Sequence, residues 1–140
     1  MLKLLGLDHV VIRTRDAPRL VAFYRDVLGC RVERETSPQT GLVQLRAGAG
    51  LIDVVAIDSA LGRAGGGPPA ADGRNMDHFC VSVAEFDESV IRAHLSRHGV
   101  DAGETRRRYG AQGFGPSIYI EDPDGNTVEI KGPPESGPVR

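Results

Sequence analysis

Two His residues and two carboxylates occupy matching positions in the two halves of this 140-residue chain. His9 and His78 each follow an Asp at the start of an apolar stretch, and Asp53 and Glu129 each interrupt a later apolar stretch. Two imidazoles with one or two carboxylates form a donor set suited to Fe(II), Mn(II), Ni(II), Co(II) or Zn(II). Each residue alone has an ordinary explanation as a core or solvated side chain. Their joint pattern favours a metal site.

The elements that must position these residues are also repeated. Each half reads as a strand, a helix and three strands, with the His on the first strand and the carboxylate on the last. We expect one α+β domain over residues 1–140, with a first module over 6–57, a linker over 58–75 and a second module over 76–132. The linker is rich in Gly, Pro and Ala and has no hydrophobic period. Neither module can bury a sheet face alone, which predicts packing about a pseudo-twofold axis.

Local signals support this order of elements. The first strand alternates, so that His9, Val11 and Arg13 share one face. Asp16 is a good N-cap for the helix that follows. The stretch 103–115 reads as a long polar loop, and residues 122–125, Asp-Pro-Asp-Gly, as a tight turn between the last two strands.

Composition excludes several classes of protein. The formal charge of −2 and a pI near 6.1 provide no electrostatic footprint for nucleic acid or an anionic membrane. No apolar run approaches the roughly 20 residues of a membrane span, and the N-terminus lacks a signal-peptide pattern. Cys30 and Cys80 are predicted to be reduced core residues. We therefore expect a cytoplasmic globular protein. Its partner, a small-molecule substrate, is expected only from the family resemblance described next.

Four segments resemble the vicinal oxygen chelate superfamily, which includes glyoxalase I, extradiol dioxygenases, fosfomycin-resistance thiol transferases and bleomycin-binding proteins. The segments are Leu7–Ile12, Phe23–Gly29, Met76–Val81 and Tyr119–Ile130. The Phe-Tyr…Leu-Gly and Asp-Pro-Asp-Gly-Asn…Glu patterns are specific for the superfamily, but they do not identify one reaction within it.

The resemblance implies a pair of βαβββ modules that form a half-open, barrel-like cup around one divalent ion. His9, His78 and Glu129 match the family's metal ligands. Asp53 falls where glyoxalase I has Glu, and its side chain is one methylene shorter. Four ligands resemble glyoxalase I, whereas two His and one carboxylate resemble the thiol transferases and the dioxygenase triad.

Three further residues are predicted to bind substrate. Arg13 lies four residues after His9, at the spacing that glyoxalase I uses for a glutathione carboxylate. The position where that enzyme has an Asn is Ile57 here, so the glutathione site is only partly present. Arg108 and Tyr109 belong to an Arg-rich, Gly-rich segment that we interpret as a mobile lid over an anionic substrate.

The function expected from this resemblance is a metal-dependent, glyoxalase-like lyase or isomerase, in which Glu129 or Asp53 acts as a general base. The alternatives are an extradiol-type ring-cleavage dioxygenase and a non-catalytic, resistance-type binding protein. The family also implies a homodimer, in which the site is built within one chain or across two.

Overall fold

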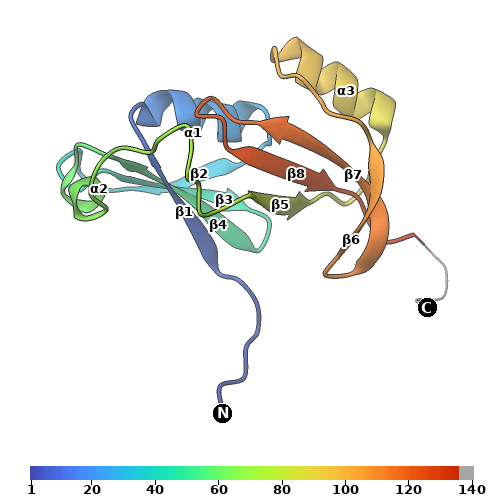
Figure 1. Ribbon diagram of the computed structural model, residues 1–140, viewed down its shortest axis with the longest axis horizontal. Coiled ribbons are helices and arrows are strands. Elements are labelled where there is room, and N and C mark those ends of the chain that lie inside the picture. Colours follow the sequence, from blue (N-terminus) through green and yellow to red (C-terminus); the bar gives the residue numbers. More distant parts are fainter. Residues whose placement is uncertain (136–140) are drawn as a thin grey trace. The chain divides into compact units, whose positions relative to one another are not determined.

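The computed structural model describes residues 1–135, and the chain divides into two compact units, Met1–Asp72 and Gly73–Arg140. Both units contain a strand, a helix and three strands in that order (Figure 1). The first unit consists of β1 (His9–Thr14), α1 (Ala17–Asp26), β2 (Arg31–Glu35), β3 (Leu42–Ala47), β4 (Gly50–Ala56) and a short helix, α2 (Ala60–Ala64). The second consists of β5 (His78–Ser82), α3 (Glu88–Arg97), β6 (Arg106–Gly110), β7 (Gly113–Glu121) and β8 (Thr127–Lys131). The predicted α+β fold of two βαβββ modules is confirmed.

The two sheets have the same topology. Their strand orders are β1-β4-β3-β2 and β5-β8-β7-β6, so the first and last strands of each module are neighbours. Those neighbours run parallel, whereas the remaining pairs in each sheet are antiparallel. A His on the first strand and a carboxylate on the last strand are therefore brought to adjacent strands in both modules.

Helix capping explains where the long helices begin. The Asp16 carboxylate accepts a hydrogen bond from the Arg19 amide at 3.1 Å, and the Asp87 carboxylate accepts one from the Val90 amide at 3.1 Å. α1 buries Leu20, Phe23 and Tyr24 and lies against β3 and β4. These contacts give one face of the first sheet its core.

The opposite face of each sheet carries the predicted metal ligands, and we call it the donor face. Alternation separates the two faces: Ile52 and Val54 are at most 2% exposed on the core face of β4, with Asp53 between them on the donor face. The same alternation places Glu129 between buried Val128 and Ile130 on β8. The donor face thus presents Asp53 and Glu129 on a framework set by the core.

Two expectations from sequence were wrong in detail. The segment 103–115 is not a long loop, because residues 106–110 and 113–121 pair as an antiparallel hairpin. Gly113 has φ +115°, a conformation that Gly adopts without strain at the tip of such a hairpin. The predicted linker contains α2, whose N-cap Ser59 accepts a hydrogen bond from the Gly62 amide at 3.1 Å. No helix among residues 1–135 is long and apolar enough to span a membrane.

The turn between β7 and β8 is held by one buried carboxylate. Asp122 is 4% exposed and accepts hydrogen bonds from the backbone amides of Asp124 and Asn126, both at 2.9 Å, and from the Asn126 side chain at 2.8 Å. Gly125 supplies the positive φ of +75° that the turn requires. This turn sets the register of β8 and hence the place of Glu129.

We predict that Asp122→Ala destabilises the protein by about 3 kcal/mol, because it leaves several N–H groups without an acceptor. Denaturant unfolding followed by circular dichroism measures the effect. Asp124→Ala is the matched control, since the Asp124 carboxylate makes no hydrogen bond within residues 1–135, and it should change stability by less than about 1 kcal/mol. Equal losses in the two variants would contradict this account of the turn.

Candidate metal centre

The second unit places His78 and Glu129 side by side. In the parallel pairing of β5 with β8, Cys80 lies opposite Glu129, so His78, two residues earlier, shares its face. The Nε2 atom of His78 lies 3.2 Å from Oε2 of Glu129. Glu129 is only 6% exposed, which makes its carboxylate a buried charge beside an imidazole.

The first unit repeats this arrangement with a shorter acid. Val11 lies opposite Asp53 in the parallel pairing of β1 with β4, and His9 again lies two residues earlier. Asp53 is 3% exposed. It makes no ion pair with His9, but its charge adds to the effect of the Asp8 hydrogen bond, which is the main cause of a raised His9 pKa. The methylene that Asp lacks relative to Glu accounts for the longer separation.

Each carboxylate keeps one buried oxygen without a hydrogen-bond partner. Among the residues that the structure describes, these are the only two such side-chain atoms, Oδ1 of Asp53 and Oε1 of Glu129. An unsatisfied buried carboxylate oxygen costs free energy unless a cation or donor compensates it. Within each unit, one imidazole and one such oxygen are donors of the kind that divalent transition-metal ions bind.

The donors are divided equally between the units. Each unit supplies one His and one carboxylate, and no group of three His, Cys, Asp or Glu residues that could hold a metal ion is present within residues 1–135. The ligand set of His9, Asp53, His78 and Glu129 therefore remains a proposal.

Each imidazole also contacts a second carboxylate, through its Nδ1 atom. Asp8 lies 2.6 Å from Nδ1 of His9, and Asp77 lies 2.6 Å from Nδ1 of His78. When Nδ1 donates to the Asp, the neutral ring presents its Nε2 lone pair to a metal, an arrangement common in metal sites. Both Asp residues are exposed, and the sequence analysis did not predict their role beside the His residues. The repeated Asp-His pair was the available signal.

The two carboxylates are supported differently. Oδ2 of Asp53 accepts a hydrogen bond from the Gln44 amide at 3.0 Å, and the Gln44 carbonyl oxygen accepts one from Arg34 at 2.9 Å. The residue opposite Glu129 is Tyr119, whose ring packs edge-on against His78 at 5.2 Å between centroids. Asp53 is therefore held by hydrogen bonds that run from Arg34 through Gln44. Glu129 lies beside His78, whose ring packs against Tyr119.

The predicted substrate-binding residues lie in three different settings. Arg13 donates to the carbonyl oxygens of Gly62, at 3.2 and 2.9 Å, and of Gly66, at 2.7 Å, so it fastens α2 to β1. Arg108 lies on the donor face, with its guanidinium 4.2 Å from the centroid of the Tyr119 ring. Tyr109 lies on the other face of β6, where it packs against Phe114. Arg108 and Tyr109 therefore lie on opposite faces of the hairpin.

Cys80 also lies on the donor face, next to Glu129. Desolvation of the thiol, together with the negative charge of Glu129, raises the pKa of Cys80 to about 11. Both cysteines are free, but only Cys30 is buried. The prediction that both are core residues is therefore wrong for Cys80, because its strand position faces away from the core.

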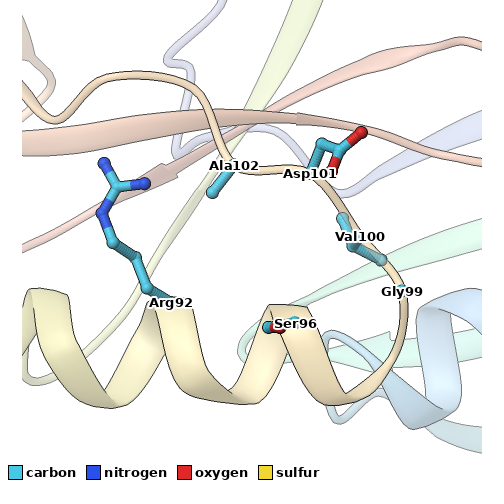
Figure 2. Close-up of a pocket in the computed structure, with 6 residues that line it drawn as sticks. All are labelled: Arg92, Ser96, Gly99, Val100, Asp101 and Ala102. Carbon is cyan, nitrogen blue, oxygen red and sulfur yellow. The ribbon is translucent and has the colours of Figure 1, made fainter.

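One cavity within the second unit lies apart from these residues. It has a volume of about 380 Å³ and is lined by Arg92 and Ser96 of α3 and by residues 99–102 of the following segment (Figure 2). The Arg92 guanidinium is already bound to Glu88 and to the Gly103 carbonyl oxygen. None of the predicted site residues lines this cavity.

Comparison with solved structures places the fold among known proteins. An integron cassette protein from V. cholerae is 28% identical, with a TM-score of 0.74 over 94% of this chain and 98% of that one. A lactoylglutathione lyase from Agrobacterium tumefaciens is 22% identical, with a TM-score of 0.64 over 91% of this chain and 93% of that one. The fosfomycin resistance protein FosX from Listeria monocytogenes is 17% identical, with a TM-score of 0.69 over 98% of this chain and 94% of that one.

A family model matches nearly the whole chain. It covers residues 6–130, which include both modules and all four predicted metal ligands. Lyases and resistance proteins both occur among the structural neighbours, so the match identifies the family and not the reaction. The chain belongs to the glyoxalase/bleomycin resistance protein/dioxygenase superfamily.

Proposed function

We propose that this protein is a divalent-metal-dependent lyase or isomerase of the glyoxalase type, acting on a small substrate with vicinal oxygens. The observation that carries the proposal is the unpartnered buried carboxylate oxygen on the donor face of each module, in the same register relative to a His. The proposed ligands are His9, Asp53, His78 and Glu129. The proposal concerns this ligand set and applies whether the donors come from one chain or from two copies in a homodimer.

Glu129 is the proposed general base. A bound divalent ion would supply Lewis-acid stabilisation for substrate oxygens. Oε1 of Glu129 has no hydrogen-bond partner within residues 1–135, so it is free to accept a proton from a carbon next to a carbonyl group. Oε2 lies beside His78, which keeps the carboxylate in place. Asp53 is held through Oδ2 by Gln44, which suits it to a fixed ligand role.

The surroundings of Arg13 support a substrate other than a glutathione adduct. Its guanidinium is bound by backbone carbonyls of α2 and the segment after it, and a Cβ at Gly65 would lie 2.4 Å from its Nε. Ile57 provides no polar group where glyoxalase I has an amide. Arg108, on the donor face of the second unit, is therefore the better candidate for substrate binding.

We predict near-stoichiometric Ni, Co, Mn or Zn in protein purified without added metal. Glu129→Ala and Asp53→Ala should each lower metal affinity by at least about tenfold, because each removes one anionic ligand. Elemental analysis and competition with a chromogenic chelator measure content and affinity. Glu121→Ala is the control, since this exposed carboxylate at the end of β7 should leave the metal in place.

The outcomes separate the candidate functions. Failure to bind any divalent metal on titration would overturn the metalloenzyme proposal and leave a small-molecule-binding protein. Stoichiometric iron, with normal affinity in Asp53→Ala, would point to a three-ligand dioxygenase. Loss of metal in both variants would direct activity assays to thiol adducts of small α-carbonyl compounds, in which Glu129→Gln should abolish turnover.

Asp8 and Asp77 provide a second test of the same ligand set. We predict that Asp77→Ala lowers metal affinity by about 10- to 100-fold without unfolding the protein, because His78 loses the acceptor that orients its ring. Asp8→Ala should act similarly through His9. Chelator competition gives the affinity, and ¹⁵N chemical shifts of the imidazoles in the metal-free protein give the tautomer. The control is Asp72→Ala, an exposed carboxylate outside both sheets. Unchanged tautomers would refute the positioning role.

A further inference from the structure

We infer that Lys131 forms an oxyanion subsite on the donor face of the second unit, which receives a carboxylate, phosphate or phosphonate group of the substrate. The inference rests on the proposed function, since it describes another part of the same site. Its starting point is that Lys131 is only 6% exposed, although lysine side chains are rarely buried without a partner.

The Lys131 side chain has space made for it by two glycines. It lies on β8 two residues after Glu129, and a Cβ added at Gly110 would lie 2.6 Å from its Cε. A Cβ at Gly115 would lie 3.0 Å from its Nζ. The hairpin of β6 and β7 therefore carries no side chain at the two positions that the lysine crosses, and a side chain at either glycine would collide with it.

The ammonium has no anionic partner in the described part of the chain. Within residues 1–135, Nζ of Lys131 makes no hydrogen bond to the protein, and no carboxylate lies within 4.0 Å of it. The carbonyl oxygens of Gly132 and Pro133 border the same space over Gly115. Glu129, the nearest carboxylate along the strand, lies against His78 instead. A largely buried cation without a counter-charge is costly, so an anion from outside would stabilise it.

A second cation lies on the same face of the hairpin. The guanidinium of Arg108 donates to Oγ of Ser117 at 2.8 Å and to its carbonyl oxygen at 3.0 Å. Ser117 lies directly opposite Lys131 in the pairing of β7 with β8. Arg108 makes no ion pair with any described carboxylate. Two cations without a carboxylate partner in the described residues, on one face of the sheet, are groups that bind an oxyanion through charge-assisted hydrogen bonds.

The position of the subsite restricts the substrate. The Cα atoms of residues two apart on a strand are separated by roughly 7 Å. Since the Lys131 side chain then extends over β7 toward Gly110, the anionic group would lie farther than that from the carboxylate of Glu129. The inferred substrate is a small molecule with vicinal oxygens at one end and an anionic group at the other. Cys80 borders the same face, but the proposal assigns it no role.

The chain offers a selective probe, because Lys3 and Lys131 are its only lysines. Protein labelled with [¹³C-ε]lysine is freed of metal with a chelator and titrated with inorganic phosphate, methylphosphonate or acetate, with sodium chloride at equal ionic strength as reference. We expect a saturable shift of the Lys131 signal at low millimolar anion and none for Lys3. Which anion binds more tightly distinguishes a phosphoryl from a carboxylate subsite.

Lys131→Met keeps the apolar stem and removes the charge. The variant should bind the anion at least about tenfold more weakly, as measured from the backbone amide shifts of Gly110 and Gly115. It should keep the native amide spectrum and the normal metal content. Lys3→Met is the matched control and should bind anion as the wild type does. The inference is overturned if neither signal saturates up to roughly 100 mM anion, or if both lysines shift alike.

Failure of this inference and failure of the proposed function give different results. A Lys131 signal that responds in a protein that never binds a divalent metal would leave an anion-binding module without the metalloenzyme. If the Lys131 signal does not change on addition of anion, but the protein binds stoichiometric metal, the subsite is refuted and the proposed ligand set stands.

Discussion

The parallel pairing of the first and last strands is the constraint on which the candidate site depends. In each module it sets a His and a carboxylate on neighbouring strands, two positions apart in register and on one face. A shift of one residue in either pairing would send one of the two side chains to the core face. The core residues between them, such as Val54 and Val128, which are fully buried, resist that shift. Packing on one face therefore fixes the chemistry on the other.

The donor face accepts an electrostatic cost that a purely structural sheet would avoid. Asp53, Glu129 and Lys131 are each at most 6% exposed. In the described residues Asp53 and Glu129 each keep one buried oxygen without a hydrogen-bond partner, and Lys131 forms no ion pair. Apolar side chains at these positions would make a more stable sheet. A bound cation or anion would offset this cost, which is why we propose that the face binds a metal and an anionic substrate.

Much of this arrangement was predictable from sequence because it follows from alternation and repetition. The pattern around His9 and Glu129 predicted their strands and faces, and the repeat predicted the common topology. The hairpin at 106–115 was not predicted, since its Arg and Gly residues carry no apolar period. The contacts of Arg13 and Lys131 were also inaccessible, because each depends on glycines distant in sequence, Gly65 for Arg13 and Gly110 for Lys131. The bond of Asp77 to His78 was not predicted either, because an exposed Asp before a His, although repeated in the two halves, does not by itself indicate a bond between the two side chains.

The two modules differ in length without any change in how their donors are set. His9 and Asp53 are 44 residues apart, whereas His78 and Glu129 are 51 apart, yet the strand pairing beside each carboxylate is the same. The connections between the paired strands absorb the difference. Insertions and deletions there can reshape what surrounds a ligand while the donors stay in place. A duplicated module of this kind can therefore diversify in substrate through its connecting segments while it inherits the donor geometry unchanged.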